Sequence, residues 1–403
     1  MSTEGPLDGQ TGMRYAPFVE RTSGEGSRAW EIHDRARKMK DAGRDIIFLS
    51  IGDPDFDTPP PIVDAVVESL RQGRTHYTAM SGILPLREAI AARHLKLTGH
   101  GVDAGAVVVT AGAQCGLFSA MLCLAGPGDE VIVPEPMYVT YEAVVGVTAA
   151  RLVQVPLRGE NGFHLDPDDL AAAVTPRSRV ILPNFPHNPT GATLTAEELE
   201  AIADIAKRHD LWVISDEVYG TLTYDQPHRS IVALPGMAER TVVVDSLSKS
   251  HAMTGWRLGW TISPGDLPGH LSNLALCMLY GCPPFIQDAA VTALSREYDE
   301  IAVMRAAFRE RRDLLVERIN AMPRIGCRKP EGSMFLMIDV RESGLGSMDF
   351  AWRLLEAHGV STLPCDGFGP SGEGYLRISL SSPLAELREF CDRLERMLHG
   401  LNR

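Results

Sequence analysis

Short apolar runs alternate along the chain with longer stretches in which apolar residues recur at helical spacing. The runs fall at residues 107–109, 131–133, 152–155, 180–182, 212–214, 242–244 and 258–262. Between two of them, Thr195 and Glu198 have the spacing of a capping box, and Leu199, Ile202 and Ala206 form the apolar stripe of the helix that follows. This alternation predicts a mostly parallel, buried sheet with helices on both faces, the central layer of a three-layer α/β sandwich.

Both ends of the chain carry further elements outside this alternation. Ala29, Ile32, Ala36 and Met39 predict a helix that Gly43 ends, before a strand over 46–51. Toward the other end, the pattern predicts a helix over 301–322, a strand over 334–340, a helix over 350–358, a strand over 375–380 and a closing helix through Leu387, Leu394 and Leu398. We expect these two blocks to form one smaller α/β domain. The predicted division is a flexible tail over 1–26, small-domain segments over 27–60 and 299–403, and a large domain over 61–298.

The composition is that of an ordinary globular protein, and it restricts the partners. The 403 residues are 44% hydrophobic and 23% charged, enough for one large core and a second smaller one. A formal net charge of −13, with no Lys/Arg tract to offset it, disfavours nucleic acid and anionic membranes. No stretch approaches the roughly 18 uninterrupted apolar residues of a membrane span. The expected partners are small molecules and other protein chains.

The cysteines and the N-terminal segment indicate the compartment. Seven cysteines, an odd number without a CxxC pair or a histidine at zinc-ligand spacing, argue against a disulfide framework and against a metal site. Residues 1–26 lack the apolar core of a signal peptide. We therefore expect a cytoplasmic protein.

One lysine is placed unlike a surface lysine. Lys249 comes shortly after the β-forming run 241–244 and stands between Ser248 and Ser250, and Arg257 follows eight positions later. Hydroxyls and a planar arginine fork suit a phosphate group, and a partly desolvated lysine amine readily forms an imine with an aldehyde. Together they suggest pyridoxal phosphate. A polar loop in which the lysine and the arginine form salt bridges would give the same pattern.

Other residues with suitable chemistry follow neighbouring strands. Gly112 lies in a turn before a helix whose first N–H groups could bind a phosphate, and the ring of Tyr138 could stack on a heterocycle. Asn188 and Tyr219 could each donate to a ring oxygen. Asp216 follows a buried strand, where its carboxylate needs a cation such as a protonated pyridine nitrogen.

Each of these residues also has an ordinary explanation. The glycine suits any turn, Asn188 begins a turn-like Asn-Pro pair, Tyr138 could be a half-buried tyrosine, and Asp216 with Tyr219 could be a helix N-cap and a core tyrosine. Their joint occurrence, each at the carboxyl end of a strand, favours a ligand site at that edge of the sheet.

These motifs, in this order, resemble those of the fold type I pyridoxal-phosphate enzymes, specifically the class I/II aminotransferases. The resemblance extends from about Ala29 to the C-terminus. It is carried by segments 52–56, 76–77, 86–87, 188–191, 216–219, 246–249 and 375–377, by the Gly112 turn and by Arg257. It implies the fold described above, pyridoxal 5'-phosphate as cofactor, and transamination between an L-amino acid and a 2-oxo acid.

The resemblance also implies a role for each residue. The catalytic residues would be Lys249, which binds the cofactor covalently and transfers the proton, Asp216 at the ring nitrogen, and Tyr219, which bonds the ring oxygen together with Asn188. Arg377 would bind the substrate α-carboxylate, helped by Asn188 and the backbone of Gly52. The other implied cofactor contacts are Gly112, Ala113, Gln114, Ser246, Ser248 and Arg257 around the phosphate, Tyr138 on the ring, and Tyr77 at the phosphate of the neighbouring subunit. Tyr77 therefore implies a homodimer with composite active sites.

Within that family, segments 135–142, 246–260 and 274–287 most resemble bacterial arginine–pyruvate aminotransferases. This closer resemblance implies arginine or a derivative as amino donor and pyruvate or a similar 2-oxo acid as acceptor. The negative net charge favours a cation, and carboxylates flank the expected pocket at Asp53, Asp55, Glu135 and Glu142. Two alternatives stay open. One is another fold type I reaction, such as β-elimination, retro-aldol cleavage or oxidation, and the other is a non-catalytic cofactor-binding sensor domain.

Overall fold

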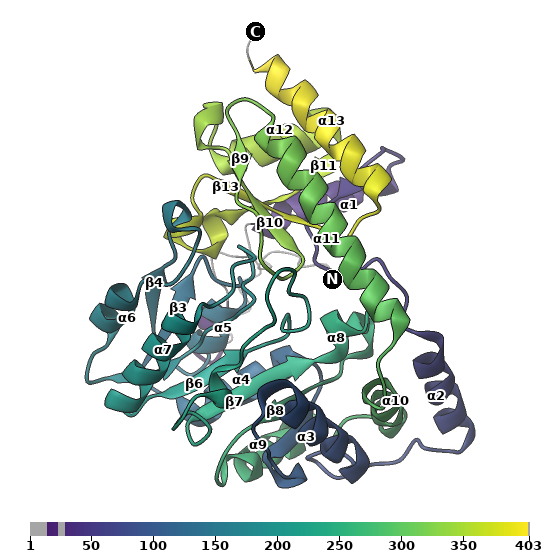
Figure 1. Ribbon diagram of the computed structural model, residues 1–403, viewed down its shortest axis with the longest axis vertical. Coiled ribbons are helices and arrows are strands. Elements are labelled where there is room, and N and C mark those ends of the chain that lie inside the picture. Colours follow the sequence, from purple (N-terminus) through teal and green to yellow (C-terminus); the bar gives the residue numbers. More distant parts are fainter. Residues whose placement is uncertain (1–13, 23–28, 402–403) are drawn as a thin grey trace.

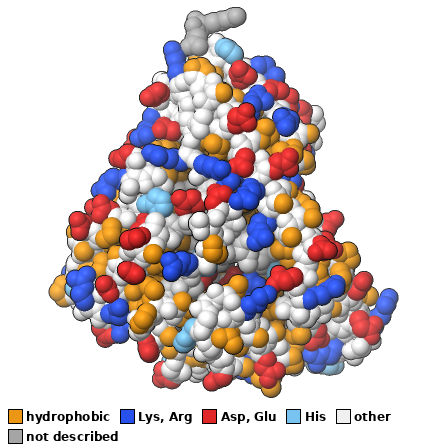
Figure 2. Space-filling model, viewed as in Figure 1, with side chains coloured by type: hydrophobic (Ala, Val, Ile, Leu, Met, Phe, Trp, Pro, Cys, Tyr) orange, Lys and Arg blue, Asp and Glu red, His pale blue; other side chains and the backbone are white. Residues whose placement is uncertain are grey.

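The computed structural model describes residues 14–22 and 29–401, and Figure 1 shows a large sheet with its helices below a smaller one. The tail predicted over 1–26 lies mostly outside the described residues. Of the described part, η1 (Glu20–Thr22) packs on α5 (Tyr141–Gly146), where Arg21 Nε donates to the Gly146 carbonyl over 2.7 Å. On the face in Figure 2, charged side chains of both signs are intermixed.

The large sheet has the strand order β2-β8-β7-β6-β5-β3-β4. Its strands are β2 (Val107–Thr110), β3 (Glu130–Glu135), β4 (Arg151–Pro156), β5 (Ser178–Ile181), β6 (Trp212–Asp216), β7 (Thr241–Ser246) and β8 (Gly259–Ile262). The pairs from β4 to β7 are parallel, whereas β8 runs antiparallel to both of its neighbours. The mostly parallel sheet predicted from the apolar runs is confirmed.

Alternate residues of the buried strands face opposite helix layers. Val131 and Val133 of β3 share a core with α4 (Ala113–Leu124), α5 and α9 (Leu267–Met278), whereas Ile132 between them packs with α6 (Pro167–Ala173) and α7 (Ala196–Arg208). At the β2–β8 end, the cover consists of α2 (Pro60–Arg71), α3 (Leu84–Thr98) and α10 (Pro284–Leu294). The three-layer sandwich is therefore confirmed, as is the capping box of Thr195 and Glu198.

The smaller core combines segments from both ends of the chain (Figure 1). Its antiparallel sheet has the order β12-β13-β10-β9, formed by β9 (Gly326–Cys327), β10 (Phe335–Asp339), β12 (Leu363–Pro364) and β13 (Tyr375–Ser379). Beside it, β1 (Ile47–Phe48) pairs in parallel with β11 (Val360–Ser361), and Ile47 lies opposite Val360. The strand expected over 46–51 is thus shorter in the structure. The surrounding helices are α1 (Ala29–Asp41), α11 (Asp299–Asn320), α12 (Ser347–His358) and α13 (Leu384–Gly400).

Candidate active site

Two residues with complementary chemistry meet at the carboxyl ends of β6 and β7. Asp216 ends β6, and β7 continues at Ser246 into the single turn α8 (Leu247–Ser250), which carries Lys249. The two strands are parallel neighbours, with Asp216 beside Val244. Ligands of open α/β sheets bind at this edge, so the carboxylate and the amine lie where a cofactor is expected.

Lys249 is a partly buried amine whose Nζ donates to the Gly52 carbonyl over 2.6 Å. Burial lowers its pKa to about 8; Asp53 opposes this shift, and the charges of Arg377 and Arg257 add to it. The amine therefore loses its proton at mildly alkaline pH, which suits a nucleophile that attacks an aldehyde.

Asp216 is a buried carboxylate with 4% of its surface exposed. Burial raises its pKa to about 6, although it accepts hydrogen bonds from the Tyr141 hydroxyl over 2.6 Å and from the Val218 N–H over 3.3 Å. Tyr141 was not expected in the site. The signal that could have found it is its place three residues after Tyr138, whose ring meets that of Tyr141 edge to face at 5.7 Å.

Asn188 and Tyr219 lie together beside this carboxylate, both almost fully buried. Burial raises the pKa of the Tyr219 hydroxyl, and neighbouring Asn188 opposes that rise. The Asn188 side-chain oxygen also accepts a hydrogen bond from Arg377 Nη1 over 3.1 Å. Asn188 therefore connects the tyrosine to the arginine, as a residue shared by cofactor and substrate would.

The turn before α4 forms a cradle with Arg257. Gly112 has φ +83°, and a Cβ at this position would lie 2.5 Å from Arg257 Nη2, so the close approach requires glycine. Ala113 and Gln114 begin α4, and the Ser246 hydroxyl accepts from the Ser248 N–H. N–H groups at a helix start, serine hydroxyls and a guanidinium are the donors that a phosphate needs, so these residues fit the phosphate end of the expected cofactor.

Arg377 on β13 is a buried guanidinium between two aromatic rings. Its Cζ lies 4.2 Å from the centre of the Phe335 ring and 5.3 Å from that of Phe368. Nη1 donates to Asn188 and Nη2 to the Ser50 carbonyl over 2.7 Å, while Nε has no partner among the described residues. A buried cation that lacks a carboxylate partner in the described part of the chain favours an anionic ligand.

Tyr77 is the expected site residue that lies apart from the others. It is 82% exposed, and its ring centre lies 4.6 Å from that of Tyr280, which is itself half exposed. Leu276, Met278 and Leu279 are exposed nearby in sequence. An exposed aromatic pair with apolar neighbours is typical of a protein interface.

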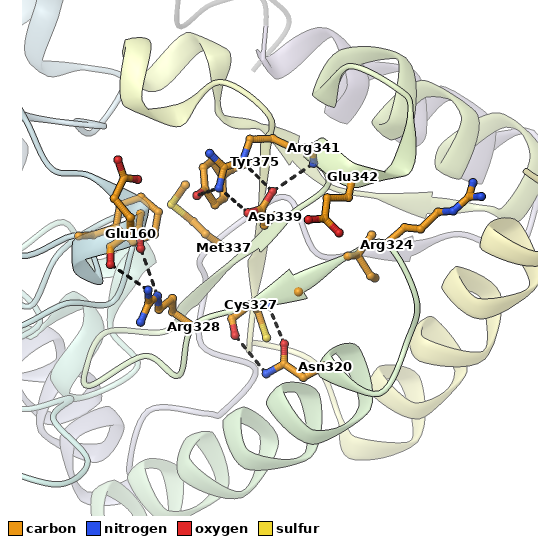
Figure 3. Close-up of a pocket in the computed structure, with 14 residues that line it drawn as sticks. Glu160, Asn320, Arg324, Cys327, Arg328, Met337, Asp339, Arg341, Glu342 and Tyr375 are labelled. Atoms are coloured by element: carbon orange, nitrogen blue, oxygen red, sulfur yellow. Dashed lines mark hydrogen bonds and ion pairs between the residues drawn. The ribbon is translucent and has the colours of Figure 1, made fainter.

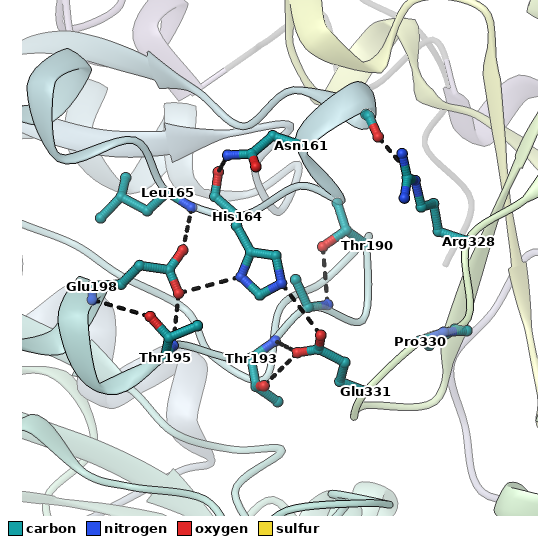
Figure 4. A network of polar contacts seen from close by, with 12 residues as sticks. Asn161, His164, Leu165, Thr190, Thr193, Thr195, Glu198, Arg328, Pro330 and Glu331 are labelled. Carbon is teal, nitrogen blue, oxygen red and sulfur yellow. Dashed lines mark hydrogen bonds and ion pairs between the residues drawn. The ribbon is translucent and has the colours of Figure 1, made fainter.

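A polar network supports the loop that carries Asn188 (Figure 4). His164 lies between the carboxylates of Glu198, at 3.2 Å, and Glu331, at 3.3 Å, which raise its pKa to about 10. Glu331 also accepts from the N–H and the hydroxyl of Thr193, and its own N–H donates to the Gly191 carbonyl over 2.9 Å. The segment that leads into β10 is thereby fixed to the loop that follows Asn188.

A groove of about 470 Å³ is lined by the turn at Gly159 and by the smaller sheet (Figure 3). Two of its arginines are already bonded to protein groups, Arg341 to Asp339 and Tyr375, and Arg328 to backbone carbonyls. None of the expected site residues lines it.

Comparison with known proteins gives consistent matches over almost the whole chain. The family model "Aminotransferase class I and II" matches residues 44–394. An arginine–pyruvate transaminase of Pseudomonas aeruginosa is 53% identical over 95% of this chain and 97% of its own length. An aspartate aminotransferase of Pyrococcus horikoshii is 38% identical over 93% and 95%. The solved aspartate aminotransferase of Thermus thermophilus with maleate superposes with a TM-score of 0.90 at 32% identity, covering 95% of this chain and 100% of that one.

Proposed function

This chain belongs to the class I and II aminotransferase family, and we propose that it transfers the amino group of a cationic L-amino acid, such as arginine, to a small 2-oxo acid, such as pyruvate. As a member of that family it depends on pyridoxal 5'-phosphate. The observation that carries the proposal is that the Lys249 amine, the Asp216 carboxylate and the Arg377 guanidinium lie near one another. Besides burial, the charge of Arg377 lowers the pKa of Lys249, and the charges of Arg377 and Asp216 both act on the Tyr219 hydroxyl. The choice of arginine and pyruvate rests on the identity to the Pseudomonas enzyme.

The residues at the sheet edge would hold the cofactor in one orientation. The Gly112 turn, Ser246, Ser248 and Arg257 bind the phosphate, and Tyr138 stacks on the ring. When bound, pyridoxal phosphate supplies an aldehyde carbon that takes the amino group and a pyridine ring that withdraws electrons. Asp216, whose pKa is about 6, is charged at neutral pH and holds a proton on the ring nitrogen, while Tyr141 fixes its second oxygen.

The remaining residues act on the substrate. Lys249, with a pKa of about 8, would accept the proton from the substrate Cα and then donate it to C4′, the aldehyde carbon of the cofactor. Arg377 binds the α-carboxylate, and its contacts with the rings of Phe335 and Phe368 hold its fork in place. Asn188 and Tyr219 donate to the ring oxygen. The aromatic walls keep water away from these charges.

The four carboxylates expected near the guanidinium of an arginine substrate differ in whether protein groups already bind them. Asp55 is held by a two-pronged ion pair with Arg311, at 2.6 and 2.9 Å, and Glu135 accepts two hydrogen bonds from Ser371. Asp53 is exposed, accepts from the Thr254 hydroxyl and lies close enough to raise the pKa of Lys249. We therefore assign the donor cation to Asp53, and half-buried Glu142 on α5 is the remaining candidate.

A donor panel tests this function. Purified enzyme is mixed with arginine, lysine, aspartate, alanine or an aromatic amino acid, and absorbance spectra follow the amination of the cofactor. A 2-oxo acid is then added, and return of the cofactor to its aldehyde form distinguishes transamination from elimination, aldol cleavage or oxidation. Faster amination by aspartate or an aromatic amino acid than by arginine would disprove the cationic donor and leave the aminotransferase intact.

We also propose a homodimer in the cytoplasm. Exposed Tyr77, whose ring contacts that of Tyr280, supports an interface that completes the neighbouring site, and light scattering of the wild type and of Tyr77→Ala measures the oligomeric state. The cytoplasmic location is supported by seven cysteines, all of them free. No helix in the described part of the chain is long and apolar enough to cross a membrane.

A further inference from the structure

The two acidic residues that begin and end β3 are buried in different ways. Glu130, at the start, is fully buried and accepts from the guanidinium groups of Arg151 and Arg177 and from the Thr175 hydroxyl. Glu135, at the end, is 3% exposed and forms no ion pair within the described residues. Burial raises its pKa, and hydrogen bonds from Ser371 and the more distant charge of Arg158 oppose that rise. A buried carboxylate without a bonded cation is costly, which indicates a role beyond stability.

The hydrogen bonds of Glu135 attach β3 to the turn that precedes β13. The Ser371 N–H donates to Glu135 Oε2 over 2.9 Å, and its hydroxyl donates to Oε1 over 2.7 Å. Gly369, two residues before, lies directly against the carboxylate, because a Cβ there would be 2.6 Å from Oε2. One residue earlier, the Phe368 carbonyl accepts from the Met137 N–H over 2.6 Å.

This attachment determines where Phe368 lies. Phe368 is fully buried and forms one of the two rings over the Arg377 guanidinium. The other ring, Phe335, is fixed separately through the segment that contains Glu331. Glu135 is thus hydrogen-bonded directly to the turn that carries Phe368, which contacts Arg377. Both of its carboxylate oxygens accept a hydrogen bond from Ser371.

We propose that Glu135 is a positioning residue for substrate binding: it holds the 369–371 turn on the large sheet so that Phe368 keeps the Arg377 fork in the plane that receives an α-carboxylate. This inference rests on the proposed role of Arg377. It assigns Glu135 to the α-carboxylate end of every amino-acid or 2-oxo-acid substrate and not to the donor side chain.

Glu135→Gln, Ser371→Ala and Glu130→Gln together test this role. In Glu135→Gln one acceptor oxygen becomes an NH2 donor, so the Ser371 hydroxyl must turn to accept from it and both charge-assisted hydrogen bonds are lost; the turn is therefore held more weakly. We expect KM for arginine, alanine and pyruvate to rise together by about tenfold in Glu135→Gln, with kcat within about threefold, and a smaller rise in Ser371→Ala. Glu130→Gln is the matched control on the same strand, and it should lower Tm while leaving KM unchanged.

Two results would overturn the positioning role. One is an unchanged KM in both folded Glu135→Gln and Ser371→Ala, with only Tm lowered. The other is a loss confined to arginine, with alanine and pyruvate unaffected, because this would mean that Glu135 contacts the donor cation. The wild-type enzyme is also assayed with amines that lack a carboxylate. If these amines react as well as amino acids, the proposed role of Arg377 is wrong. If the wild-type enzyme requires a carboxylate on its substrate but KM is unchanged in the variants, only the inference about Glu135 is wrong.

Discussion

Replacing His164 by glutamine tests how strongly the network in Figure 4 stabilises the fold. The hydrogen bonds that His164 donates to Glu198 and Glu331 raise its pKa from 6.5 to about 10, which at face value corresponds to about 5 kcal/mol. The His164 side chain is 26% exposed and that of Glu331 is 42% exposed, so solvent screens the interaction. We therefore expect His164→Gln to lower the free energy of unfolding by about 2 kcal/mol at pH 6.

The pH dependence identifies the charge as the cause. Because the folded protein binds this proton more tightly than the unfolded chain, the stabilisation is complete below pH 6.5 and is lost as pH rises through about 10. Burial tends to raise the pKa of Glu331, but hydrogen bonds from His164 and Thr193 lower it to about 2. Glu331 therefore remains charged over this whole pH range. The difference in the free energy of unfolding between wild type and His164→Gln should therefore shrink to roughly a few tenths of a kcal/mol by pH 9.5.

Urea unfolding at pH 6, 8 and 9.5 and constant ionic strength measures this difference. His209→Gln is the matched control, since His209 is the exposed residue at the C-terminal end of α7. If the loss of unfolding free energy in His164→Gln is the same at all three pH values, the stabilisation does not arise from the charge of His164.

Three further variants test the chemistry. Lys249→Ala should abolish turnover, and borohydride reduction with peptide mapping of the wild type should label Lys249; a label on another lysine contradicts the assignment. Asp216→Asn should bind the cofactor but lose about 10³-fold or more in kcat, because a neutral amide no longer favours a protonated ring nitrogen; near-normal turnover contradicts this. Arg377→Lys should raise KM for the donor with the cofactor spectrum unchanged, since lysine lacks the fork; an unchanged KM would exclude that role.

The positions of Lys249 and Asp216 at one sheet edge could be predicted, because apolar runs mark buried strands and parallel strands end on the same side. The antiparallel direction of β8 could not be predicted, because a short apolar run does not indicate which strands it pairs with or in which direction it runs. Tyr141 was missed because its bond to Asp216 depends on how α5 docks on the sheet.

The flanking acids show the same limit more clearly. In the sequence, Asp55 and Glu135 resemble carboxylates available to a substrate. In the structure their partners are Arg311 and Ser371, which lie more than two hundred positions further along the chain. Local patterns report propensity and burial, whereas the pairing of distant polar groups is decided only when the domains assemble.

The pairing of Ile47 with Val360 has a consequence for how the protein is made. A ribosome releases the N-terminal helix α1 long before α12, β11 and β12, which pack against it, have been synthesised. Ile32 and Met39 must therefore wait, exposed or sheltered by a chaperone, while the large sheet folds first. Such non-local contacts form slowly because a long loop must be closed before any contact is gained. The opening helix can therefore settle only after the segment from α12 to β12 has been synthesised.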